Sequence, residues 1–290
     1  MRTAAAGDLA PAQARMADAG LKAMVPFERP FLDYLLHNLA DSGISRACIV
    51  IGPSHGAVRE YYAGVATRRL TIEFAIQQTP RGTADAVVAA DGFIGGDHAL
   101  VVNGDNLYPV SACRAPVEHG GPALAAFSRA GLLADGLIAP ERILQFAVVA
   151  ARDGWLERIV EKPDAATLAV FGDDVFVSMN TWVVPPGLRR IVSQLPLSPR
   201  GELELPLAMQ ALVDSGVGVR VFTSNEPVLD LSNRSDIAAL DRARQRGTTS
   251  VIGVLSEHFD PPGNEERARF RQPAIERGPP VTCGHKRRGA

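Results

Sequence analysis

The stretch TIEFAIQQTPRGTADAVVAADGFIGGDHALVVNGDN, residues 71–106, decides the fold class. Residues 71–77 alternate apolar and polar side chains, which is the pattern of a β-strand. The alanine-rich residues 83–93 predict a helix, and residues 99–102 predict a second short apolar strand that ends in a polar turn. A strand, a helix and a strand in succession indicate a βαβ unit and hence a parallel sheet.

Residues on the amino-terminal side continue this alternation. Leucines spaced three and four apart over residues 32–39 define one helical face, and Gly43 ends that helix. Residues 47–52, ACIVIG, form a continuous apolar run that is typical of a parallel strand buried on both faces. Another short helix is predicted over residues 57–63.

The carboxyl-terminal half is richer in strand patterns and has fewer helices. The runs PALAAF, FAVVAA, WLERIV and VFVSMNTWVV predict additional, partly antiparallel strands. A helix returns over residues 203–215, followed by the strand VRVFTS and a last helix over residues 235–244. We therefore expect an α/β protein with a mixed, mainly parallel central sheet flanked by helices.

Shifts in composition divide the chain into three parts. Residues 1–19 are expected to be an irregular segment, and residues 20–253 are expected to form one domain. Residues 254–290 are rich in proline, glycine and charge without any periodicity, which predicts a flexible tail.

The overall composition is that of an ordinary globular protein. Hydrophobic residues make up 46% and charged residues 21%, and the formal net charge is -2. Without a basic excess we expect no nucleic-acid partner, although a pocket for a small anion needs only a few positive groups. The three cysteines lack metal-ligand spacing, and no apolar run reaches the length of a membrane span. These features favour a cytoplasmic protein without a membrane partner.

Carboxylates follow two of the predicted strands. In open α/β sheets ligands bind at the carboxyl ends of strands. Asp105, in the turn NGDN, and Asp230, in VLDLSN, occupy such positions and could share one divalent cation. Each of them taken alone is equally compatible with an ordinary turn residue.

Other loops carry residues suited to phosphates or sugars. Glu161 and Lys162 stand together in VEKP, where lysine suits a phosphate and glutamate can accept hydrogen bonds from hydroxyl groups. Gln77 and Gly82 lie before a helix start, and Lys22 lies in a nonhelical segment. A surface ion pair, a capped helix start and an exposed lysine are the structural alternatives for these three loops.

The order of the motifs carries more information than any one of them. GLKAMVP, QQTPRGTADA, NGDN, VEKP, PRGELELP and VLDLSN follow one another over about residues 20–243. In order and spacing the chain resembles the bacterial glucose-1-phosphate thymidylyltransferases and uridylyltransferases, which are sugar-1-phosphate nucleotidylyltransferases. The resemblance implies their Rossmann-like nucleotide-diphospho-sugar transferase fold.

The resemblance also implies roles for residues on the nucleotide side. Gln77 and Gly82 match positions that contact the base, and Lys22 matches a catalytic lysine near the nucleotide phosphates. Asp105 and Asp230 match the carboxylates that bind Mg²⁺, and Asp105 is thereby also assigned to the catalytic group.

On the sugar side, the resemblance assigns Glu161 and Lys162 to the sugar and its phosphate, with Lys162 also catalytic. Asn106 and Asn180 are further candidates for sugar contacts. Arg200 and Glu202 fall in a matching motif, and we interpret that stretch as structural support.

The reaction implied joins a nucleoside triphosphate, dTTP or UTP, to a sugar 1-phosphate, with glucose 1-phosphate as the default, and releases pyrophosphate. Two anions must meet, so Mg²⁺ and lysines neutralise their repulsion while catalysis relies on positioning and electrostatics. No covalent enzyme intermediate is needed. Relatives are often multimeric, so a homo-oligomer is expected.

The amino-terminal residues depart from the family pattern. The family opens with a central strand and a loop of the type G-x-G-T-R-M, which the segment AAAGDLAPAQAR does not match. We expect that the chain begins just inside that loop, which predicts weak or absent activity and low stability because a neighbouring strand would lose its partner.

Two other functions remain to be weighed. A binding or regulatory protein could have kept the scaffold without catalysis. A metal-dependent glycosyltransferase is disfavoured because NGDN has one carboxylate where such enzymes usually show Asp-x-Asp. The glycine motifs of nicotinamide dehydrogenases and of P-loop kinases are absent.

Overall fold

The computed structural model describes residues 9–65, 67–135, 137–164, 166 and 176–246. The tail predicted over residues 254–290 therefore lies outside the described residues. The segment expected to be irregular contains the helix α1 (Pro11–Asp18), so that expectation is wrong for these eight residues. Contacts outside the helix explain the difference, since the buried Gln13 amide donates to the Pro26 carbonyl at 3.1 Å and to Asp241 Oδ2 at 3.0 Å.

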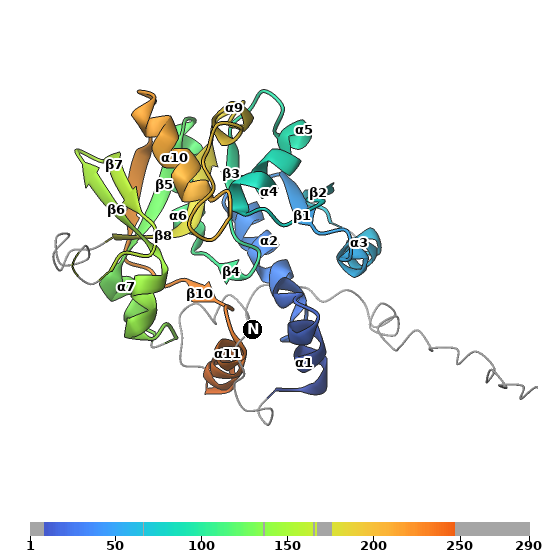
Figure 1. The fold of residues 1–290 in the computed structure, drawn as a ribbon. Coiled ribbons are helices and arrows are strands. Elements are labelled where there is room, and N and C mark those ends of the chain that lie inside the picture. Colours follow the sequence, from blue (N-terminus) through green and yellow to red (C-terminus); the bar gives the residue numbers. More distant parts are fainter. Residues whose placement is uncertain (1–8, 66, 136, 165, 167–175, 247–290) are drawn as a thin grey trace, which may run out of the picture. The chain divides into compact units, whose positions relative to one another are not determined.

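The largest sheet of the described residues has six strands (Figure 1). The last strand in the order also pairs with the second one, so five of the strands form a ring of neighbours. In sheet order the strands are β3 (Ala99–Val101), β8 (Phe176–Val184), β5 (Ala123–Ser128), β9 (Arg220–Ser224), β7 (Trp155–Val160) and β6 (Ala147–Arg152).

The predicted strands of the amino-terminal half form a separate parallel pair. β1 (Arg46–Ile51) and β2 (Thr71–Ile76) pair along their whole lengths, and α3 (Gly56–Ala63) connects them. Among the described residues, the six-stranded sheet does not include either strand. This pair confirms the parallel pattern expected from the apolar run at residues 47–52.

The mixed character of the sheet is confirmed, but parallel pairings do not dominate it. In the six-stranded sheet of the described residues only β5 and β9 run parallel, and the other pairs are antiparallel. One reason is local, because β6 and β7 are joined by Asp153 and Gly154, which both have positive φ, as a two-residue hairpin turn requires. The other reason is that β8 runs against three neighbours.

Two apolar layers cover opposite faces of the sheet. Along β5, Ala125 and Phe127 pack into one cluster with α2 (Phe31–Asp41), while Leu124 and Ala126 pack into a second cluster with α4 (Thr83–Ala89). The leucine face predicted over residues 32–39 belongs to the first cluster. Both faces of this strand are thus buried, which explains its continuous apolar sequence.

Short elements connect these layers and carry the polar loops. Among the described residues, every helix is too short or too polar to cross a lipid bilayer. The remaining elements are η1 (Lys22–Met24), α5 (Asp91–Ile94), β4 (Asn106–Leu107), α6 (Val110–His119), α7 (Arg129–Leu133), η2 (Pro140–Gln145), α9 (Arg189–Val192), α10 (Leu205–Asp214), β10 (Leu229–Asp230) and α11 (Arg234–Arg246).

Candidate active site

A two-stranded ladder brings the two predicted metal-binding carboxylates together. β10 runs antiparallel to β4, so that Asp230 faces Asn106 in the register. The backbone N–H of Leu231 also donates to the main-chain oxygen of Asp105 at 2.9 Å. Asp105 and Asp230, which are far apart in the sequence, therefore line the same cavity.

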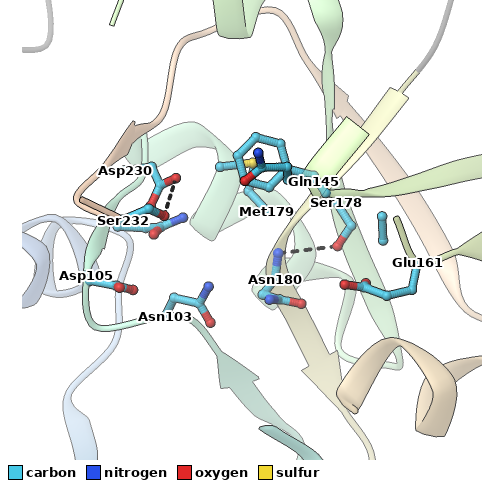
Figure 2. Close-up of a pocket in the computed structure, with 12 residues that line it drawn as sticks. Asn103, Asp105, Gln145, Glu161, Ser178, Met179, Asn180, Asp230 and Ser232 are labelled. Carbon is cyan, nitrogen blue, oxygen red and sulfur yellow. Dashed lines mark hydrogen bonds between the residues drawn. The ribbon is translucent and has the colours of Figure 1, made fainter. Parts of the chain in front are cut away.

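The cavity has an acidic wall and an opposite wall of mixed polar character. Figure 2 shows Asp105 and Asp230 on one side, with Ser178, Asn180 and Glu161 on the other. The lining residues are Asn103, Asp105, Asn106, Gln145, Phe146, Ala147, Glu161, Ser178, Met179, Asn180, Asp230 and Ser232.

A bulge in β8 shapes the opposite wall. The register between β5 and β8 shifts so that Met179 and Asn180 have no partner on β5. Asn180 adopts φ +59, a left-handed conformation that asparagine tolerates better than most residues. A bulge of this kind re-aims a side chain, and here it brings Asn180 to the cavity lining.

The buried Tyr108 ties the two walls together. Its hydroxyl donates to the main-chain oxygen of Met179 at 2.6 Å and accepts from the backbone N–H of Asn103 at 3.2 Å. Burial raises the pKa of Tyr108 well above its usual value, so the hydroxyl keeps its proton as a donor. The spacing between the walls is therefore fixed by a neutral hydrogen-bonded group.

Asp230 is surrounded by donors within a nearly dry environment. Arg142 forms an ion pair with its Oδ2, and the Ser232 hydroxyl lies 2.8 Å from both carboxylate oxygens. With its amide oriented to satisfy its neighbours, Asn106 donates to Asp230 Oδ1 at 3.2 Å. Burial raises the pKa of Asp230 to about 6, while Arg142 opposes that rise and the negative charge of Asp105 adds to it.

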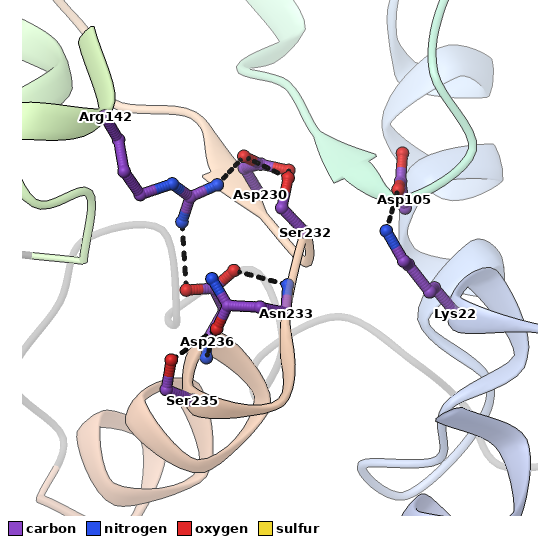
Figure 3. Close-up of polar contacts among 8 residues, drawn as sticks. All are labelled: Lys22, Asp105, Arg142, Asp230, Ser232, Asn233, Ser235 and Asp236. Atoms are coloured by element: carbon purple, nitrogen blue, oxygen red, sulfur yellow. Dashed lines mark hydrogen bonds and ion pairs between the residues drawn. The ribbon is translucent and has the colours of Figure 1, made fainter. Parts of the chain in front are cut away.

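Arg142 also contacts a second carboxylate at the start of α11. Its Nη1 lies 2.9 Å from Asp236 Oδ1, and the other oxygen of Asp236 accepts from the backbone N–H of Asn233 at 2.9 Å. The Asn233 side chain in turn accepts from the backbone N–H of Asp236 at 3.2 Å. This reciprocal capping fixes the carboxylate of Asp236 (Figure 3).

Lys22 lies at the acidic wall rather than apart from it. Its Nζ is 3.5 Å from Asp105 Oδ2, and each of the two side chains is 30% exposed (Figure 3). An ammonium group at this place can contact an anion that approaches the two carboxylates. The predicted role of Lys22 at the phosphates remains a prediction, but its position beside Asp105 is compatible with it.

The VEKP loop places its two charged residues differently. Glu161 lines the cavity, and burial together with the neighbouring carboxylate of Glu204 raises its pKa. Lys162 has φ +46, and its Nζ is 4.0 Å from Glu161 Oε1. Lys162 does not appear among the described residues that line the cavity, and its catalytic contact stays a prediction.

Gln77 and Gly82, predicted to contact the base, do not line the cavity. The Gln77 amide donates to the main-chain oxygen of Gly82 at 3.0 Å and to Asp85 Oδ2 at 2.9 Å. Gly82 has φ +113 and passes so close to Leu203 that a Cβ atom would lie 2.4 Å from the Leu203 oxygen. The structure thus gives both residues a structural role, and their contact with a base remains a prediction.

The PRGELELP motif agrees with the structural interpretation. Arg200 donates from Nε to the side chain of the buried Glu204 at 3.0 Å, and Glu204 is the residue that precedes α10. Arg200 also lies 3.5 Å from Glu202. Their ion pairs organise the start of the helix whose apolar face packs under the sheet.

Several residues of the site were missed by sequence reasoning. Arg142 and Gln145 lie in the 3-10 helix η2, which carries no distinguishing sequence motif, and Ser178 was interpreted only as part of a strand. Ser232 lies within VLDLSN and Asp236 lies three residues after it, and both resemble ordinary helix-start residues. Only their tertiary contacts with Asp230 and Arg142 distinguish them.

The donor set suits a cation that takes few protein ligands. No group of three or more histidine, cysteine or acidic side chains could enclose a metal ion in the described part of the chain. Mg²⁺ is usually bound by one or two carboxylates together with substrate phosphates. Asp105 and Asp230, beside an open cavity, fit that mode of binding.

Comparison with known proteins decides the family. Residues 18–226, more than half of the chain, match the family model described as nucleotidyl transferase. The chain belongs to the nucleotidyl transferase family. The family resemblance predicted from the order of motifs is therefore confirmed.

Curated relatives of this nucleotidyl transferase are distant. A low-salt glycan biosynthesis nucleotidyltransferase of Haloferax volcanii is 27% identical over 207 residues, which are 69% of this chain and 53% of the relative. A glucose-1-phosphate thymidylyltransferase of Streptomyces antibioticus is 27% identical over 242 residues, which are 79% of this chain and 62% of the relative. The chain thus spans less than two thirds of the length of either relative.

Solved structures confirm the predicted fold. A UDP-glucose pyrophosphorylase in complex with UDP-glucose gives a TM-score of 0.64 at 14% identity and covers 78% of this chain and 90% of its own. The UDP-glucose pyrophosphorylase of Acinetobacter baumanii gives a TM-score of 0.62 at 14% identity and covers 81% of this chain and 89% of its own. At such identities the likeness shows the nucleotide-diphospho-sugar transferase fold and nothing about substrates.

Proposed function

We propose that this nucleotidyl transferase joins a nucleoside triphosphate, dTTP or UTP, to a sugar 1-phosphate, with glucose 1-phosphate as the first candidate. A phosphate oxygen of the sugar phosphate attacks the α-phosphorus, and the bond from that phosphorus to the oxygen bridging the β-phosphate breaks. Pyrophosphate leaves with the electron pair of that bond. The products are a nucleotide diphosphate sugar and pyrophosphate.

One observation carries the proposal, namely that Asp105 and Asp230 lie on one side of a cavity whose other side holds Glu161 and Asn180, while Lys22 pairs with Asp105 at 3.5 Å. Mg²⁺ held by the two carboxylates would neutralise the phosphate charges when bound. Lys22 contributes a positive charge at the same wall. Glu161 and Asn180 offer hydrogen-bonding groups suited to sugar hydroxyls.

Catalysis in this arrangement depends on orientation and charge. The Tyr108 hydrogen bonds set the distance between the acidic wall and the bulge of β8. Two anionic substrates held on these walls would meet with their reacting groups already oriented. Binding would thus supply in advance the loss of translational and rotational entropy that the reaction requires. The chemistry requires no nucleophilic side chain of the protein.

We also propose that the protein is cytoplasmic and forms a homo-oligomer. The scattered cysteines and the absence of long apolar runs favour the cytoplasm. The resemblance to multimeric enzymes favours a homo-oligomer. Both proposals can be checked by fractionation of cells and by light scattering.

The direct test is a pyrophosphate-release screen of four nucleoside triphosphates against several sugar 1-phosphates. Asp105→Asn should abolish release for every active pair because it removes one of the two converging carboxylates. The matched control is Asp97→Asn, since Asp97 is exposed and away from the cavity lining. Release that survives in Asp105→Asn would refute the assignment of the site.

Calorimetry with a nucleotide sugar distinguishes the proposed enzyme from a binding or regulatory protein that lacks catalysis. Binding without release of pyrophosphate from any substrate pair would favour a binding or regulatory protein on the same fold. If the chain neither binds a nucleotide sugar nor releases pyrophosphate, both proposed functions of the cavity are refuted.

A further inference from the structure

Arg142 connects the acidic wall of the cavity to the start of helix α11. Its guanidinium contacts Asp230 through Nη2 and Asp236 through Nη1 (Figure 3). The side chains of Arg142, Asp230 and Asp236 are only 11%, 4% and 11% exposed. In so shielded a bridge the desolvation of the charges offsets much of their attraction, but removal of its centre leaves two buried carboxylates without this counter-charge.

The bridge from Arg142 reaches Oδ2 of Asp230, while Oδ1 is contacted by the neutral Ser232 hydroxyl and Asn106 amide. Arg142 does not clasp both oxygens of Asp230, because its two terminal nitrogens serve different carboxylates. It takes Oδ2, while Oδ1 lies on the side of Asn106, the neighbour of Asp105 in the chain. The guanidinium therefore fixes the carboxylate plane from the side away from β4.

The charges around the acidic wall also favour binding of a cation. The acidic wall of the cavity holds Asp105 and Asp230, with Lys22 at Asp105 and Arg142 at Asp230. Since Asp236 shares Arg142, the five groups sum to one negative charge when all are ionised. A divalent cation therefore meets a wall that attracts it, although each carboxylate already has a positive neighbour.

We infer that Arg142 is a positioning residue for the cation site. It holds the Asp230 carboxylate in the orientation that a cation shared with Asp105 requires. The inference rests on the proposed cation site of the preceding section. Asp236 is the anchor of this arrangement, because its own capping contacts fix the guanidinium at the far end. Ligating carboxylates are commonly oriented by outer hydrogen-bonding partners of this kind.

The test uses the full-length chain and Mn²⁺ alone as the probe, followed by electron paramagnetic resonance of the free ion. Arg142→Met keeps an apolar stem of similar length and removes the charge. It should weaken Mn²⁺ binding by about 10- to 100-fold, the usual effect of losing an outer-shell partner. Arg142→Lys should recover part of the loss, because an ammonium can serve Asp230 but does not span both carboxylates.

Asp236→Asn supplies a second variant that leaves Arg142 and Asp230 in place. It should weaken Mn²⁺ binding less than Arg142→Met does. The double variant should bind as Arg142→Met does, since the anchor acts only through the arginine. The matched control is Arg152→Met, because Arg152 is 76% exposed and pairs with Glu157 outside the cavity.

The outcomes separate this inference from the proposed function. If the unmodified chain binds Mn²⁺ and neither Arg142→Met nor Asp236→Asn changes the affinity, the role of Arg142 is refuted while the cation site stands. If the unmodified chain binds no Mn²⁺, with or without a nucleoside triphosphate, the cation site itself is refuted and the inference falls with it. If Arg142→Met does not fold, the double variant of Asp236→Asn and Arg142→Lys is compared with the two single variants. A loss of Mn²⁺ affinity equal to the sum of the two single losses would overturn the proposed coupling.

Discussion

Replacement of Gly82 by alanine should destabilise the fold, and the cost can be worked out from the backbone around it. At φ +113 an alanine is strained by about 1–3 kcal/mol. Its Cβ would also lie 2.4 Å from the Leu203 oxygen and 2.8 Å from the Leu203 nitrogen. Overpacking of this kind adds about 1–3 kcal/mol.

The neighbouring backbone has little freedom to relieve that overlap. The Leu203 nitrogen donates to the Arg81 oxygen at 2.7 Å, and the Leu203 oxygen accepts from the Ala84 nitrogen at 2.9 Å. A shift of Leu203 would weaken both bonds. The free energy of unfolding should therefore fall by about 2–6 kcal/mol in total.

Urea denaturation and thermal melting measure the effect. For a domain of this size each kcal/mol lowers Tm by about 2–4 °C, so Gly82→Ala should melt at least about 4 °C lower. Gly92→Ala is the control, because a Cβ there meets no atom within 4 Å and the residue lies in α5. A Gly82→Ala variant that melts with the control would refute the steric argument and leave a ligand contact as the explanation of this glycine.

Three further variants test separate parts of the structure. Burial raises the pKa of Asp230 from 3.8 to about 6, so the stability that its protonated form contributes is lost as the pH rises from about 4 to 6. In urea titrations, Asp230→Asn should therefore gain stability relative to the unmodified chain between pH 4 and pH 7. Parallel plots of unfolding free energy against pH for the two proteins would contradict this. Tyr62→Phe removes the hydrogen bond that its hydroxyl donates to Asp33 at 2.7 Å and should cost about 1–3 kcal/mol in the same assay. An unchanged midpoint would show that this hydrogen bond does not stabilise the packing of α3 on α2. Gly154→Ala strains a hairpin turn at φ +78 and should lower Tm, and an unchanged Tm would show that the turn adapts.

The elements with strong periodicity could be predicted from the sequence, because their patterns reflect local burial. The apolar run at residues 47–52 became β1, and the leucine face over residues 32–39 became the buried face of α2. The pairing of strands could not be predicted in the same way. β8 pairs with three strands that lie before it in the sequence, and no local pattern encodes that choice.

Helix α1 shows the opposite limit. Residues 11–18 have no apolar stripe, so the sequence favoured an irregular segment. Contacts of the Gln13 side chain with Pro26 and Asp241 supply what the missing stripe would normally provide. Tertiary contacts of polar groups thus decide a helix that propensity alone leaves open.

The candidate site divides along the same line. Motif order led to Asp105, Asp230 and Glu161, because the ends of strands are where ligands gather in such folds. The same motifs include Gln77 and Gly82, whose observed contacts are explained by the packing of residues 81–85 against Leu203. The motifs that carry the family resemblance therefore include both residues that line the cavity and residues that shape the backbone.

Arg142 marks where sequence reasoning stops for a physical reason. An arginine in a short 3-10 segment has no pattern that distinguishes it from an exposed charge. Its importance follows only from being brought, nearly dry, between Asp230 and Asp236, which come from a different part of the chain. Because burial makes a charge costly unless it is paired, the exposure of an arginine and the identity of its partners carry the functional information. The contacts of Arg142 are thus visible only in the folded chain, whereas the cavity-lining Asp105, Asp230 and Glu161 are visible earlier, as motifs.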